Sequence, residues 1–196
     1  MIVPTMMRRR ILVLALCLPS AWVPIDGAAQ ETPAEISMDA QRLLEQIDTE
    51  DPDLRRRAFL QLEALREPAT ASAIRRYLAD RRVELRTLSV RALAAIEGAR
   101  SVPALLERLQ RDRSPAVRLQ SILAVEPFVG QDASALPPLL KALRDRQPDV
   151  RIAAIDVVSR SEKPEAKEAL TLRWKRERHR DVRRVLEAAM KRVGEL

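Results

Sequence analysis

The feature that most constrains the fold of this chain is a unit of about 32 residues that occurs five times in 196 residues. Each unit is anchored by a large apolar residue followed by arginine, and successive anchors lie 31, 32, 33 and 32 residues apart. The anchors are Leu54-Arg55, Leu85-Arg86, Val117-Arg118, Val150-Arg151 and Val182-Arg183. A fixed period in this range is typical of solenoids, in which each unit packs mainly on its neighbours.

The residues after each anchor predict an α-helix with one buried face. Large apolar residues recur at the anchor and at five and eight positions beyond it, and a small residue stands at the fourth position in four units. These offsets share one face of a helix, and the small residue lets a neighbouring helix approach closely. Pro52, Pro115 and Pro148 predict the helix starts, whereas Gly98, Gly130 and Gly194 predict helix ends with positive φ.

A second, more variable helix precedes each anchor. Its apolar residues include Leu43, Ile74, Leu106 and Leu139, each eleven positions before an anchor. An acidic residue often ends this helix five positions before the anchor; these acids are Asp80, Asp112, Asp145 and Glu177. The unit is therefore a helix–turn–helix. The sequence predicts an all-α, right-handed α-solenoid of about five helix pairs over residues 37–196.

The repeated string resembles the HEAT repeat family in its short, HEAT-like form. The resemblance is carried by Asp145 followed by Pro148-Asp149-Val150-Arg151-Ile152-Ala153-Ala154, and by Asp112 with Pro115-Ala116-Val117-Arg118. It covers roughly residues 37–196, and five copies in phase make it specific. Thr49 and Glu187 depart from the pattern, as expected for terminal units that meet water on one side. Some relatives are metal-dependent hydroxylases with His-Glu pairs, and others are lyases that attach bilin pigments.

The first 29 residues predict a secretory signal peptide. Arg8-Arg9-Arg10 precede a short apolar run, and Gly27-Ala28-Ala29 offers small residues for cleavage. The alternative is a membrane anchor, but Pro19, Pro24 and Asp26 interrupt the run before it reaches the ~20 apolar residues that a span needs. We therefore predict cleavage near Ala29, a periplasmic or secreted location, a polar linker over residues 30–36 and no transmembrane segment after cleavage.

The sequence contains no recognisable catalytic or cofactor-binding constellation. His179 is its only histidine, so one chain cannot assemble a histidine-based metal cluster or triad. Cys17, the only cysteine, would leave with the signal peptide. The four glycines are isolated, so no phosphate-binding loop is present. We predict that the chain has no catalytic activity of its own and binds no cofactor.

The anchor arginines form a ladder with one member per unit, and two interpretations are open. They could form a basic stripe for an anionic ligand. Alternatively, each could pair with a turn acid in its own or the neighbouring unit, a role that suits the planar guanidinium. The second interpretation is favoured because a residue present in every unit usually serves stacking. This predicted structural ladder comprises Arg55, Arg86, Arg118, Arg151 and Arg183 with Asp80, Asp112 and Asp145.

The segment from Arg173 to Arg184 is the densest basic stretch. A nucleic-acid interface would need uncompensated charge together with stacking aromatic residues. Acids interrupt this segment, and its single aromatic, Trp174, falls at a position expected in the core. We therefore do not expect a nucleic-acid partner. An acidic protein or an anionic membrane surface fits the segment better.

Two function classes remain open. The first is an exported scaffold for protein–protein interaction that uses a concave surface lined by the second helices. The second is an enzyme, or an enzyme accessory, that acts on a prosthetic group in the manner of a lyase. For the scaffold, the candidate partner-binding positions are those that lie off the apolar helix face. They are Arg56, Glu63, Arg91, Asp156, Arg160, Arg184 and Lys191.

Overall fold

The computed structural model describes residues 35–196, and within them the chain is entirely helical. The predicted signal peptide and most of the predicted linker lie outside the described residues. Each unit contributes a first and a second helix, as expected. The first helices are α1 (Met38–Ile47), α3 (Ala71–Arg76), α5 (Val102–Arg111), α7 (Leu136–Ala142) and α9 (Pro164–Arg176). The second helices are α2 (Pro52–Leu65), α4 (Val83–Glu97), α6 (Pro115–Val125), α8 (Pro148–Val158) and α10 (Arg180–Arg192).

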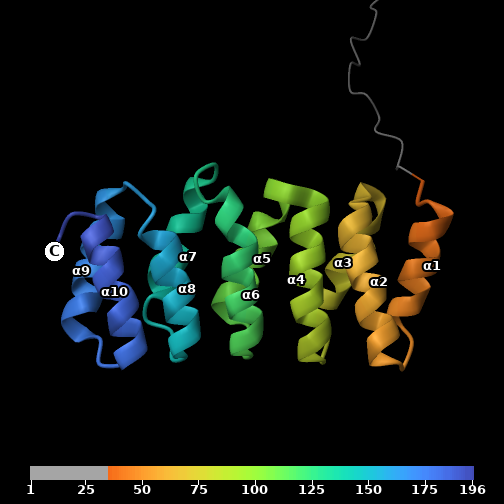
Figure 1. Cartoon of the computed structure of the whole chain (residues 1–196). Helices are drawn as coiled ribbons and strands as arrows, with labels where there is room; N and C mark the ends of the chain where they lie inside the picture. Colours follow the sequence, from red (N-terminus) through yellow and green to blue (C-terminus); the bar gives the residue numbers. More distant parts are fainter. Residues whose placement is uncertain (1–34) are drawn as a thin grey trace, which may run out of the picture. The chain divides into compact units, whose positions relative to one another are not determined.

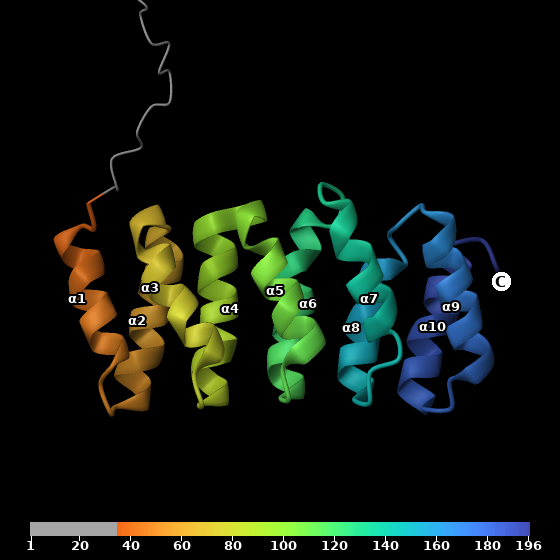
Figure 2. The ribbon, with the colours of Figure 1, turned by 180° about the vertical axis from the view of Figure 1, so that it is seen from behind.

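The helices stand in two rows. Figure 1 shows the second helices side by side in chain order, and each packs on the next from α2 to α10. Figure 2 views the repeat from behind, where the first helices form the other row. The second helices make the tighter row, while α5, α7 and α9 contact one another less extensively. The predicted all-α solenoid of five helix pairs is confirmed.

Local sequence explains most of the helix boundaries. Prolines occupy the first turn of α2, α6 and α8, where a missing N–H costs nothing. Gly98 and Gly194 have φ of +57° and +76°, as predicted for residues that end helices. The prediction for Gly130 is wrong, because this residue does not have positive φ. Helix α6 already stops at Val125, since Pro127 cannot continue the α-helical hydrogen bonding.

The predicted apolar offsets line the interface between the two rows. The anchors Leu85, Val117, Val150 and Val182 are fully buried, whereas Leu54 in the first unit is half-buried. The small residues at the fourth offset are buried as well. Ser89 and Ser121 donate their hydroxyls to the carbonyls of Leu85 and Val117, at 2.6 and 2.8 Å. These bonds satisfy two buried hydroxyl groups, so neighbouring helices can pack against the serines without leaving a hydroxyl unpaired.

We expect Ile155→Asp to unfold the whole repeat array. Ile155 is fully buried, and an unpaired carboxylate there should cost several kcal/mol in a short array that has few interfaces to spare. Thermal unfolding followed by circular dichroism provides the measurement. The matched control is Leu123→Asp, whose side chain is 46% exposed on α6 and should be tolerated. A wild-type melting curve for the Ile155 variant would show that the register is wrong.

Candidate functional site

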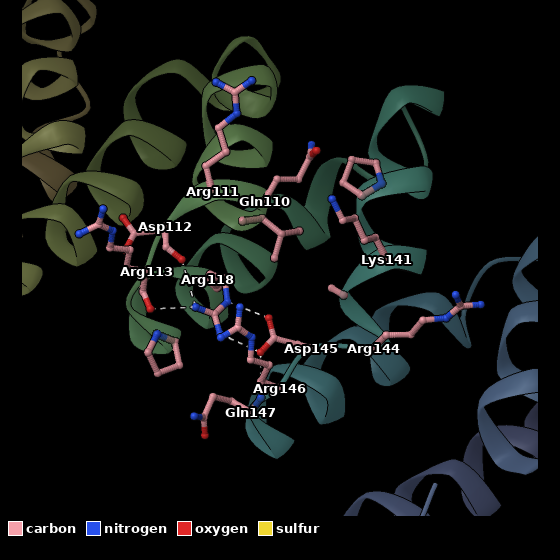
Figure 3. Close-up of a pocket in the computed structure, with 14 residues that line it drawn as sticks. Gln110, Arg111, Asp112, Arg113, Arg118, Lys141, Arg144, Asp145, Arg146 and Gln147 are labelled. Carbon is pink, nitrogen blue, oxygen red and sulfur yellow. Dashed lines mark hydrogen bonds and ion pairs between the residues drawn. The ribbon is translucent and has the colours of Figure 1, made fainter. Parts of the chain in front are cut away.

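The ladder arginines connect consecutive units, as Arg118 shows most clearly. Its Nε and Nη2 atoms each donate to the Asp145 carboxylate at 2.7 Å, across the boundary between units three and four. Its Nη1 atom donates to the carbonyls of Asp112 and Arg113 in its own turn, at 3.0 and 3.1 Å (Figure 3). One guanidinium therefore links the turn of its own unit to the turn of the next unit and fixes their relative positions.

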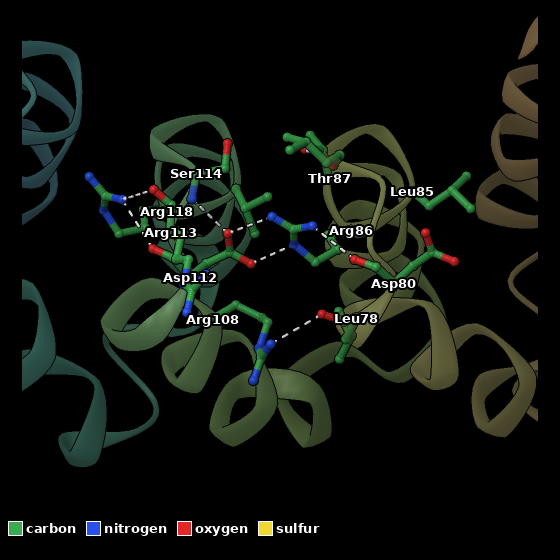
Figure 4. Close-up of polar contacts among 12 residues, drawn as sticks. Leu78, Asp80, Leu85, Arg86, Thr87, Arg108, Asp112, Arg113, Ser114 and Arg118 are labelled. Atoms are coloured by element: carbon green, nitrogen blue, oxygen red, sulfur yellow. Dashed lines mark hydrogen bonds and ion pairs between the residues drawn. The ribbon is translucent and has the colours of Figure 1, made fainter.

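The same geometry recurs on either side. Arg86 donates two bonds to Asp112, at 2.8 and 3.0 Å, and one to each carbonyl of Asp80 and Arg81 (Figure 4). Arg151 likewise donates to Glu177 at 3.0 and 3.3 Å. The turn acid has a second role, because each also accepts from a backbone N–H two residues later in its turn. Each acid thus organises a turn and receives an arginine from the preceding unit.

These acids are ionised despite their burial. Loss of hydration by itself would raise the pKa of Asp112, Asp145 and Glu177. Hydrogen bonds from the arginines and from backbone N–H groups outweigh that effect and lower all three pKa values. The pKa of Glu177 falls to about 2. In the same way, the hydrogen bonds to Asp112 and Asp145 raise the pKa of Arg86 and Arg118. Both members of each pair are therefore charged at neutral pH.

The first boundary breaks the pattern, and here Asp80 does not play the role expected of a ladder acid. Its carboxylate binds Arg82 in its own turn, at 3.0 and 3.1 Å, instead of the anchor arginine of unit one. Arg55 donates Nη1 to the Thr49 carbonyl at 2.7 Å, but its buried Nε has no partner among residues 35–196. Units three to five carry serine, glutamine or histidine at the position of Arg82, so no arginine at that position competes for their turn acids. In unit five, Arg173 of α9 binds Glu177 in addition to Arg151.

The last arginine of the ladder also differs, because no further unit follows within the described residues. Arg183 donates Nη1 to the Glu177 carbonyl at 3.2 Å. Its guanidinium carbon lies 4.3 Å from the centroid of the Trp174 ring, a cation–π contact in place of an ion pair. Trp174 is half-buried and packs against the core.

The seven candidate partner-binding residues all belong to the second helices or follow them directly. We call their shared surface the second-helix face. Several of them pair with residues of a neighbouring unit: Arg91 with Glu63 at 3.2 Å, Arg56 with Glu84 at 3.2 Å, and Arg160 with Glu126. Asp156 contacts both Arg160 and Arg192. Arg184 and Lys191 pair only within α10. Much of the charge on this face is therefore compensated.

The same face also carries apolar residues that the repeat pattern did not predict. Leu60 and Leu123 are 41% and 46% exposed, and both lie six positions after an anchor. Leu119 and Ile152, two positions after their anchors, are half-buried beside the core. The sequence does contain a signal for them, because large apolar residues stand two or six positions after the anchor. In other units these positions are polar, as at Arg56 and Asp156. Leu119, Leu123 and Ile152 give α6 and α8 a small apolar patch.

Two further properties bear on function. Among the described residues, no group of three or more histidine, cysteine, aspartate or glutamate side chains is placed to hold a metal ion. No helix in residues 35–196 has both the length and the apolar character needed to cross a bilayer.

Comparison with known proteins identifies the class. The HEAT repeats family matches residues 40–126 and 102–191, so the chain belongs to the HEAT repeat family. No curated protein matches.

Three solved structures illustrate the fold. The complex of CpcE and CpcF of phycocyanin lyase from Nostoc sp. PCC7120 has 20% identity and a TM-score of 0.64, covering 77% of this chain and 97% of that chain. The designed armadillo repeat protein YIII(Dq)4CqI has 18% identity and a TM-score of 0.52, covering 77% and 80%. Another designed armadillo protein, in complex with the peptide (KR)4, has 17% identity and a TM-score of 0.54, covering 77% and 80%. These likenesses show the fold.

We predict that Arg118→Lys and Arg151→Lys each destabilise the fold by about 1 kcal/mol or more, because lysine keeps the charge but loses the planar fork. Chemical unfolding of each variant measures the loss. Arg56→Lys is the matched control, since its side chain is 60% exposed and such surface pairs contribute little. If the ladder instead served a ligand, the two variants would unfold like wild type and lose affinity in a salt-dependent manner.

Proposed function

We propose that this chain is an exported scaffold that binds a protein partner on its second-helix face and has no catalytic activity of its own. The observation that carries the proposal is the apolar patch of Leu119, Leu123 and Ile152 on that face. Leu123 is exposed, and the charged residues of the same face largely pair with one another. An exposed apolar centre within a polar rim is the usual arrangement of a protein-binding surface.

The ladder supports this function by fixing the face in advance. Bidentate pairs at three successive boundaries hold the turns, and Arg91–Glu63 and Arg160–Glu126 connect neighbouring units on the face itself. A surface that is ordered before binding loses less conformational entropy on association. Two of the similar folds are also found with a polypeptide partner, one in a complex of two chains and one with a bound peptide.

The second candidate function is an enzyme or enzyme accessory acting on a prosthetic group. The observation that favours it is the likeness to the phycocyanin lyase complex, which covers nearly all of that chain. The two functions predict different companions. A lyase-like protein should purify from its own cells with a chromophore or metal at one equivalent, whereas a scaffold should purify with a stoichiometric protein.

We expect Leu123→Asp to abolish capture of the partner from an envelope extract. Burying an aspartate at the centre of the interface should weaken binding at least tenfold, a loss of about 1.4 kcal/mol or more. The tagged wild type identifies the partner by mass spectrometry, and titration with the purified partner gives the affinities. Leu172→Asp is the matched control, because Leu172 is 38% exposed on α9 in the other row. Equal losses in both variants, or a bound chromophore without a protein partner, would contradict the proposal.

For export, the expected result is a native protein that begins near Gln30 and is recovered outside the cytoplasm. Processing would remove three basic residues and one acidic residue, which lowers the net charge from +7 to +5. N-terminal sequencing of protein purified from its natural cells provides the measurement. Residues 1–29 still attached to the native protein would reject the cleaved signal peptide.

A further inference from the structure

The turns between first and second helices form an edge of the repeat that carries many cations. In units three to five, arginine stands on both sides of the turn acid: Arg111 and Arg113, Arg144 and Arg146, and Arg176 and Arg178. All six of these arginines are exposed. Each turn acid, by contrast, is held inward in its ladder pair. The ladder therefore removes the negative charge from this turn edge and leaves the positive charge at its surface.

A cavity of about 720 Å³ opens on the turn edge between units three and four (Figure 3). Six cationic and two anionic side chains line it. Both anions are already engaged, Asp112 with Arg86 and Asp145 with Arg118. Arg111 lies 3.5 Å from Glu107. The remaining lining cations, Arg113, Lys141, Arg144 and Arg146, have no carboxylate within ion-pair distance in the described part of the chain.

The cavity continues as a groove between α5 and α7. A second cavity of about 500 Å³ shares Gln110, Arg111 and Pro138 with the first and adds Pro103, Leu106, Ser134 and Glu107. The Glu107 carboxylate is already paired with Arg108 and Arg111. In Figure 3, Lys141 reaches from α7 into the space facing Gln110 of α5. The groove thus combines a basic end at the turn edge with a partly apolar wall between the helices.

We propose that this groove binds an acidic segment of a partner polypeptide in extended conformation, with its carboxylates on Arg113, Lys141 and Arg146. The site is separate from the second-helix face and does not depend on it. Neighbouring turns lie roughly 10 Å apart, the usual distance between packed helices. An extended chain advances roughly 3.3 Å per residue. Two acids three positions apart could therefore meet Arg113 and Arg146 in the turns of units three and four.

The shape and chemistry of the groove favour a polypeptide over other polyanions. A bilayer surface is flat and cannot enter a groove between two helices. Single-stranded nucleic acid would be expected to stack on aromatic side chains. No aromatic residue lines either cavity in the described structure. A polypeptide can supply both carboxylates for the basic end and apolar side chains for Leu106 and Pro138.

The test measures binding of a fluorescein-labelled peptide with glutamate at every third position and leucine or serine between. Fluorescence anisotropy at low and high salt compares the wild type with a triple variant, Arg113→Gln, Lys141→Gln and Arg146→Gln. We expect at least a tenfold loss of affinity in this variant and weaker wild-type binding at high salt. The matched control removes three exposed cations that lie outside both the groove and the second-helix face, Arg42→Gln, Arg100→Gln and Lys163→Gln, and should change affinity less than twofold.

A charge-reversed triple variant, Arg113→Glu, Lys141→Glu and Arg146→Glu, guards against misfolding as the cause. It should bind the same peptide with lysine in place of glutamate. Equal loss in the control variant would overturn the proposal. So would a glutamine peptide that binds as well as the glutamate peptide. The same holds if phosphatidylglycerol vesicles or a 20-nucleotide single-stranded DNA bind the wild type while the acidic peptide does not.

Discussion

The structure depends on one repeated interaction, the two-pronged hydrogen bonding of an anchor arginine to the turn acid of the following unit. Buried ion pairs do not guarantee stability, because both charges lose hydration. Here the additional bonds are present: Arg118 also binds two carbonyls, and Asp145 also accepts the N–H of Gln147. Units two to five must therefore meet one another in one register. Apolar packing between Leu and Val side chains alone would fix that register less strictly.

This interaction also determines the character of the two functional surfaces. Because the turn acids face inward, the flanking arginines determine the charge of the turn edge. Because units three and four are held in register by the pair of Arg118 and Asp145, side chains such as Glu126 and Arg160 can meet across them on the second-helix face. The two surfaces differ in kind, one cationic and grooved, the other apolar within a charge-compensated rim. A scaffold with both could hold two segments of one partner or two different partners.

At the first boundary the ladder departs from its pattern because a neighbouring arginine competes for the turn acid. Arg82 binds Asp80 from only two residues away. Such a local contact costs less conformational entropy than one made by an arginine of the preceding unit. Arg55 then remains with the Thr49 carbonyl, and its closest carboxylate is that of Glu84, 3.9 Å away. At the other end, Trp174 takes the place of an acid for Arg183. The boundary between units one and two is consequently held less firmly than the three boundaries that follow it.

The sequence by itself determined the helix pairs, their register and most of the core, because a helix buries residues at fixed offsets such as Ile155 and Val158 from Val150. It also indicated that the anchor arginines and turn acids belong together. Only the tertiary structure decided that Arg118 reaches Asp145 of the next unit, that Asp80 is held by Arg82, and that Leu123 stays exposed. Periodicity records which side of a helix is buried. It does not record which neighbour comes within hydrogen-bond distance, since that follows from how the units stack.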